Sequence, residues 1–138
     1  MRFIDANVFI YAILKPRRQL TDRECRIKTI AKRILERIDK GEEVVTSVVH
    51  LSEVANILED IAGITFTTSF IRDLLFKGNI HVEKVTMEDY LESTLLAREK
   101  SISINDALAY IIMKRRKINE IYTFDKHFRE LDVRIIQE

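Results

Sequence analysis

Apolar residues recur along this chain in two patterns, as short continuous runs and as longer stretches with helical spacing. The short runs are rich in β-branched residues and predict strands, at residues 2–4, 44–46, 80–85, 121–124 and 133–136. The longer stretches place apolar residues three or four positions apart and predict helices, at residues 6–14, 21–41, 47–63, 66–76, 86–100 and 103–117.

Strands that alternate with helices are typical of a parallel sheet with helices on both faces. Right-handed crossover connections between the strands place the helices in layers on the two faces of the sheet. We therefore expect an α/β fold, a three-layer sandwich in which a central, mostly parallel sheet of about five strands is flanked by helices. A length of 138 residues fits one domain, residues 1–138.

Composition narrows the function without naming it. The 23 basic and 22 acidic residues leave a net charge of only +1, so affinity for nucleic acid must come from a local patch or a bound metal. Cys25 is the single cysteine, which excludes an internal disulfide and a cysteine-based zinc site. The N-terminus lacks a secretory apolar region and no run is long enough to span a membrane, so we expect a cytoplasmic protein.

Three acidic residues occupy positions that a parallel sheet brings to one edge. Asp5 ends the first predicted strand, Asp125 follows the fourth, and Asp106 lies in the first turn of its helix. Ligands of open α/β folds bind at the edge formed by the carboxyl ends of the strands. Glu53, early in the helix after the second strand, is expected on the same rim. Clustered carboxylates repel one another and favour a cation such as Mg²⁺, whose chemistry suits phosphodiester hydrolysis.

Each acid also has a purely structural interpretation. Asp5 can cap the following helix, and Asp106 can be the acid of a capping box that begins at Ser103. Asp125 can be a turn residue, and Glu53 lies off the apolar stripe of its helix, as a solvated residue would. Two other α/β enzyme classes fit poorly. A phosphotransferase of the haloacid dehalogenase type needs an acid where this chain has Asn7. A response-regulator receiver needs adjacent acids at its first strand.

Four segments resemble PIN-domain nucleases, and within them the toxin subunit of VapBC-type toxin–antitoxin pairs. The matching segments, in family order, are Phe3–Tyr11, Ser52–Val54, Asn105–Ala107 and Thr123–Phe128. The resemblance implies a metal-dependent endoribonuclease that uses Mg²⁺ or Mn²⁺. It makes Asp5, Asp106 and Asp125 metal ligands, with Glu53 contributing directly or through water, and this role of Glu53 depends most on the resemblance. It also implies that Asn7 and Thr123 support the site by hydrogen bonding.

The resemblance further implies an antitoxin partner and a homodimer. The apolar segment Phe66–Phe76 is interpreted first as core, and second as part of a groove among the early helices that takes an antitoxin peptide. The alternative function that the residues leave open is a non-catalytic PIN-like module for RNA binding or assembly.

Basic and histidine side chains give weaker predictions. A basic cluster near the first two helices is a candidate for contacts with RNA phosphates, or else a solvated face; its members are Lys15, Arg17, Arg18, Arg23 and Arg26. The run 114–117 is interpreted as structural, because cations complement the carboxyl end of a helix. His50, His81 and His127 lack the spacing of a zinc motif and are expected to be structural or exposed.

Overall fold

The computed structural model describes residues 1–15 and 18–138. Its strands are β1 (Arg2–Ile4), β2 (Val44–Ser47), β3 (Ile80–Glu83), β4 (Glu120–Tyr122) and β5 (Arg134–Ile136). Its α-helices are α1 (Ala6–Ile13), α2 (Asp22–Asp39), α3 (Val48–Ala62), α4 (Ile64–Phe76), α5 (Met87–Lys100) and α6 (Ile104–Arg115). A short 3₁₀ helix, η1 (Lys126–Glu130), connects β4 to β5.

All five strands pair in parallel, in the order β3-β2-β1-β4-β5. This confirms the expected α/β fold with a five-stranded sheet. The chain builds the sheet outward from β1 through β2 to β3, and then crosses to the other side of β1 to form β4 and β5. The order of the strands therefore reverses between β1 and β4, and such a switch point leaves a crevice at the carboxyl ends of the two strands. Asp5 directly follows β1 at this crevice.

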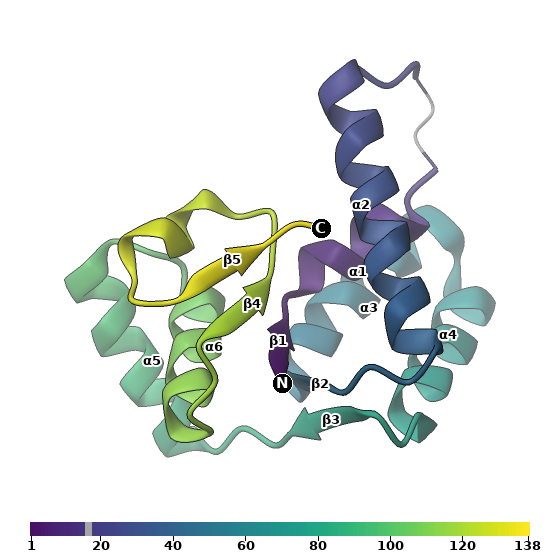
Figure 1. The fold of residues 1–138 in the computed structure, drawn as a ribbon. Helices are drawn as coiled ribbons and strands as arrows, with labels where there is room; N and C mark the ends of the chain where they lie inside the picture. The colour runs from purple at the N-terminus through teal and green to yellow at the C-terminus, as the bar shows by residue number, and fades with distance from the viewer. Residues whose placement is uncertain (16–17) are drawn as a thin grey trace.

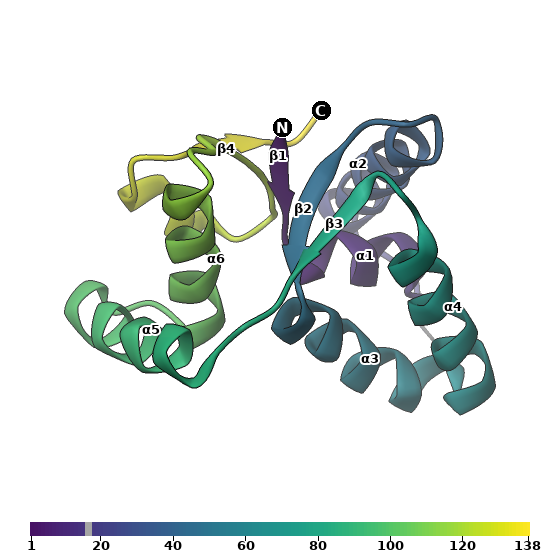
Figure 2. The same ribbon diagram turned by 90° about the horizontal axis from the view of Figure 1, so that it is seen from below.

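Helices cover both faces of the sheet, which gives the expected three layers (Figures 1 and 2). Side chains alternate between the two faces of a strand, so neighbours in β1 enter different cores. Ile4 packs with buried residues of α1, α2, α3 and α4, whereas Phe3 packs with Leu108, Ile112 and Phe128 on the other face. Figure 2 shows α5 outside α6 on that second face. The positions at the carboxyl ends of the strands are thereby held by two buried cores.

Sequence signals for helix ends are confirmed in the structure. The Thr21 side chain accepts a hydrogen bond from the Glu24 backbone N–H, and the Glu24 carboxylate accepts one from the Thr21 backbone N–H, which is the expected capping box. Ser47 caps α3 through the backbone N–H of His50. None of the helices in the described part of the chain is long and apolar enough to cross a membrane.

Several predicted boundaries were wrong by one or two residues. The strand expected at 80–85 ends at Glu83, because its partner strand ends at Ser47, where α3 begins. The strand expected at 121–124 ends at Tyr122, and the last strand begins one residue late, at Arg134. The helix expected from Phe66 begins at Ile64, because the positive φ of Gly63 ends α3 and the chain re-enters a helix at once.

Candidate functional site

Asp5 lies at the carboxyl end of the central strand and is almost completely buried, with 6% of its surface exposed. Its Oδ1 accepts a 2.8 Å hydrogen bond from the Ala6 backbone N–H, so the residue does cap α1. Its Oδ2 accepts a 2.7 Å hydrogen bond from the hydroxyl of Thr123. Burial raises the pKa of Asp5 to about 6, although both hydrogen bonds act in the opposite direction. The capping role therefore accounts for only one of the two carboxylate oxygens.

The Thr123 hydroxyl connects Asp5 to two other parts of the rim. Besides donating to Asp5, it accepts hydrogen bonds from Asn7 Nδ2 at 3.3 Å and from the Asp125 backbone N–H at 3.0 Å. One donor and two acceptor positions exhaust the capacity of a hydroxyl. Asn7 Oδ1 in turn accepts from the Phe124 N–H at 3.3 Å. Asn7 and Thr123 thus fasten the segment after β4 to the start of α1.

Asp106 lies in the first turn of α6, where its backbone N–H donates to Ser103 Oγ at 3.0 Å. The carboxylate is 6% exposed, and its Oδ2 is buried without a hydrogen-bond partner among the described residues. Burial raises the pKa of Asp106 to about 8, with further contributions from a hydrogen bond with Asp125 and from repulsion by Asp5 and Asp125. Asp5 and Asp125 are therefore close enough to Asp106 to oppose its ionisation.

His127 is exposed, in line with the sequence-based expectation, but its side chain also lies beside the aspartates. Its Nδ1 lies 3.0 Å from Asp125 Oδ1 and 3.8 Å from Asp106 Oδ2. Ligand atoms of Asp106, Asp125 and His127 all lie within 4.8 Å of one another, a spacing that suits a shared metal ion. Asp125 Oδ1 also accepts from the His127 backbone N–H at 2.9 Å, at the start of η1. The sequence signals for His127 were its position two residues after Asp125 and its place in the family-like segment Thr123–Phe128.

Glu53 occupies a different place from the three aspartates. Its Oε1 accepts a 2.5 Å hydrogen bond from Asn105 Nδ2, next to Asp106 in the chain. It is half-buried and does not belong to the compact ligand group formed by Asp106, Asp125 and His127 among the described residues. Its connection to the aspartates therefore runs through the amide side chain of Asn105.

His50 is buried and structural, as expected. Its Nε2 lies 3.1 Å from the Asn105 carbonyl oxygen, which can only accept, so this nitrogen carries the proton. Its Nδ1 lies 2.6 Å from Ser47 Oγ and accepts from that hydroxyl. Burial lowers the pKa of His50 to about 4. The neutral ring thereby fixes the residue before Asp106 to the start of α3.

The predicted RNA-contacting arginines have different surroundings. Arg17 lies outside the described residues, and Arg18 forms a two-pronged hydrogen bond to Glu24 at 2.9 and 2.8 Å. Arg23 lines a groove of about 890 Å³ that also includes Asn7, Asp125 and His127.

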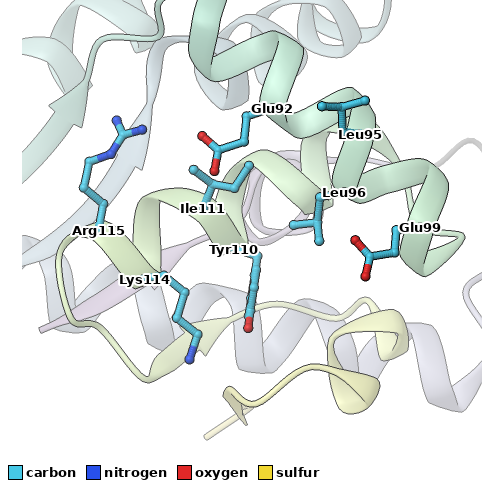
Figure 3. Close-up of a pocket in the computed structure, with 8 residues that line it drawn as sticks. All are labelled: Glu92, Leu95, Leu96, Glu99, Tyr110, Ile111, Lys114 and Arg115. Carbon is cyan, nitrogen blue, oxygen red and sulfur yellow. The ribbon is translucent and has the colours of Figure 1, made fainter.

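The basic run at the end of α6 is structural, as interpreted from the sequence. Lys114 pairs with Asp132, Arg115 with Asp89, and Arg116 with Glu83. A second cavity, of about 660 Å³, lies between α5 and α6 beside this run (Figure 3). Its lining includes Glu92, Glu99 and Tyr110 but none of the predicted site residues, whereas Asp125 and Asn7 line the groove of about 890 Å³.

Comparison with known proteins gives one family and a set of similar folds. The family model described as "PIN domain" matches residues 2–134. The Mycobacterium tuberculosis toxin VapC20, which cleaves the sarcin–ricin loop, is 22% identical, with a TM-score of 0.72 over 97% of this chain and 99% of that one. A toxin–antitoxin complex from Klebsiella pneumoniae contains a chain that is 15% identical, with a TM-score of 0.66 over 99% of this chain and 96% of that one. No curated protein matches the sequence significantly.

Proposed function

The chain belongs to the PIN domain family, and from this membership we propose that it is a metal-dependent endoribonuclease that hydrolyses phosphodiester bonds in RNA. The observation that carries the proposal is the buried Oδ2 of Asp106, which lacks a hydrogen-bond partner among the described residues. A buried carboxylate oxygen without a partner is costly. A cation in contact with it and with Asp125 removes that cost.

The donor set fits a hard divalent ion, and we propose Mg²⁺ or Mn²⁺ with Asp5, Asp106 and Asp125 as the carboxylates around it. Asp106 and Asp125 offer oxygens within 4.8 Å of each other. Asp5 lies near enough to raise the pKa of Asp106 by repulsion. We assign Glu53 to the same cluster through Asn105, whose side chain it holds.

When bound, the ion neutralises charge on the scissile phosphate and acidifies water for attack on phosphorus. The chain's own residues hold the acids in place for that chemistry. Thr123 fixes Asp5 and the backbone of Asp125 through one hydroxyl. Ser103 and His50 fix the start of α6, which carries Asp106. This assignment requires no serine, cysteine or histidine nucleophile.

The experiment that tests this function is cleavage of labelled single-stranded RNA with Mg²⁺ or Mn²⁺, by the wild type and Asp106→Asn side by side. We expect cleavage that needs the metal and disappears in the variant. Equal cleavage by the two proteins would contradict the site. No cleavage of varied RNAs by the wild type would favour the non-catalytic binding or assembly module.

We also propose that the chain is the toxin of a toxin–antitoxin pair, acts in the cytoplasm as a single domain, and forms a homodimer. The similarity in fold to a chain of a toxin–antitoxin complex supports the antitoxin partner. An apolar groove of about 560 Å³ among α1, α2 and α4 supports a docking place for an antitoxin peptide, where Phe9, Leu35, Phe70 and Phe76 are among the lining residues. The Phe76 side chain there is 81% exposed.

A further inference from the structure

The groove of about 890 Å³ beside Asp125 and His127 has basic side chains on two opposite elements. Arg23 and Arg26 come from α2, and Lys126 and Arg129 come from η1. All four side chains are exposed. Among residues 1–15 and 18–138, none of the four forms an ion pair. Their charges are thus available to an anionic ligand.

The helical spacing of α2 explains how one wall of the groove is built. Positions 23, 26, 27 and 30 follow the i, i+3, i+4, i+7 rule and share one face of a helix. Arg23 and Arg26 on that face are joined by Ile27 and Ile30, which also line the groove. In Figure 1 the N-terminal half of α2 rises on the side of the sheet where the central strands end. The basic face of α2 therefore lies on the same side of the sheet as the candidate site.

The acids in the groove do not cancel these cations. Of the described residues that line it, Glu24 and Asp125 are acidic. Glu24 is already paired with Arg18, which lowers the pKa of Glu24 to about 2. Arg18 is therefore already paired with Glu24, unlike the four cations of the groove. Apart from Asp125 and the paired Glu24, the charged side chains that line the groove are therefore basic.

Two aromatic rings line the same groove. Tyr11 and Phe124 meet edge to face, with ring centroids 5.7 Å apart, and both are half-buried. Aromatic surface combined with a basic track is the arrangement that binds single-stranded nucleic acid, because bases stack on rings while cations contact phosphates. A duplex keeps its bases stacked inside and cannot use such rings.

We propose that this groove binds the single-stranded segment of RNA next to the scissile bond. Arg23, Arg26, Lys126 and Arg129 contact its phosphates, and Tyr11 and Phe124 contact a base. The inference rests on the proposed ribonuclease function for its position beside the acids. It adds Lys126 and Arg129 to the candidate RNA-contacting residues, keeps Arg23 and Arg26, and removes Arg18.

Affinity measured without cleavage tests the groove. In an Asp106→Asn background, binding of a labelled single-stranded oligoribonucleotide is titrated at several salt concentrations, with and without Arg26→Ala plus Arg129→Ala. We expect about tenfold weaker binding and a salt slope smaller by about 1.4, since each phosphate contact on a single strand contributes about 0.7. The matched control, Arg72→Ala plus Arg98→Ala, removes two exposed arginines outside the groove and leaves both values unchanged.

A second pair of variants tests the base contact. Tyr11→Leu is expected to weaken binding about tenfold without changing the salt slope, whereas Tyr11→Phe keeps the ring and the affinity. An unchanged salt slope in the arginine double variant would overturn the proposal that this groove binds RNA. If the wild type cleaves RNA but the arginine double variant keeps the wild-type salt slope, the RNA-binding role of the groove is rejected and the ribonuclease function is retained. A groove-dependent slope without any cleavage by the wild type overturns the ribonuclease function alone.

Discussion

The hydroxyl of Thr123 donates a 2.7 Å hydrogen bond to the buried carboxylate of Asp5, joining the ends of two neighbouring parallel strands. The same hydroxyl accepts from Asn7 and from the backbone of Asp125. A single oxygen atom therefore sets the relative position of two of the acids.

Replacing this hydroxyl is expected to disturb the site more than its size suggests. Thr123→Val preserves the shape but leaves Asp5 with one donor fewer, which costs about 1–3 kcal/mol of folding free energy. We expect RNA cleavage to fall roughly tenfold or more, because the Asp5 carboxylate and the backbone of Asp125 lose their common anchor. Urea unfolding and cleavage rates check this. Thr123→Ser keeps the hydroxyl and serves as the control; equal defects in both variants would contradict the anchor.

Asp106→Asn is expected to stabilise the metal-free protein while it abolishes cleavage. Burial and neighbouring charge raise the pKa of Asp106 to about 8, so the folded chain retains a proton that the unfolded chain releases at lower pH. The stability linked to this group is complete below the ordinary pKa near 3.8 and is lost as the pH rises through about 8. The amide removes that loss, and a gain of about 1 kcal/mol raises the unfolding midpoint by about 4 °C.

Thermal unfolding in the presence of a chelator, measured near neutral and at alkaline pH, checks this expectation. Adding Mn²⁺ should then raise the midpoint of the wild type but not that of Asp106→Asn, because the variant lacks a ligand. A metal-induced shift of the same size in both proteins would place the ion elsewhere.

His50 gives a pH dependence of the opposite sign. Burial lowers the pKa of His50 from 6.5 to about 4, so the folded chain keeps the ring neutral while the unfolded chain protonates it. This stability is fully present above pH 6.5 and is lost as the pH falls through about 4. Between about pH 7.5 and about pH 5 the loss is about 2 kcal/mol.

His50→Gln can still donate to the Asn105 carbonyl but does not titrate in this range. Urea unfolding of the wild type and the variant at both pH values isolates the contribution of His50 from that of the aspartates. We expect the stability difference between the two proteins to shift by about 2 kcal/mol in the variant's favour at the lower pH. A pH-independent difference would show that the ring is not held in its neutral form.

Phe76 tests the antitoxin groove. Its side chain is 81% exposed, so Phe76→Ser should change the free energy of unfolding by no more than about 0.5 kcal/mol. Loss of this ring from the apolar groove is expected to weaken co-purification with the proposed antitoxin partner. Met87→Ser removes a side chain of similar exposure, 79%, from α5 and should leave the complex intact. Equal capture by both variants would place the partner elsewhere.

Local signals in the sequence were sufficient for most of the fold. The alternation of apolar runs and helical stripes determined the order of the elements, and capping residues such as Thr21 and Ser47 marked where helices begin. Boundaries were wrong where pairing decides them: β3 ends at Glu83 because its partner strand ends at Ser47. A strand end of this kind depends on a neighbour that is remote in the sequence.

The sequence also predicted that the aspartates lie at one edge of the sheet, because the carboxyl ends of parallel strands and the amino ends of the following helices share that edge. Tertiary structure alone decided the remaining contacts of the site. Glu53 of α3 accepts a hydrogen bond from Asn105 of α6, His127 in η1 lies near Asp106, and Arg18 pairs with Glu24. These contacts depend on side-chain rotamers and on the distances between packed elements. The periodicity of a sequence specifies which face of an element a residue occupies. It carries no information about side-chain rotamers or about the distances between packed elements.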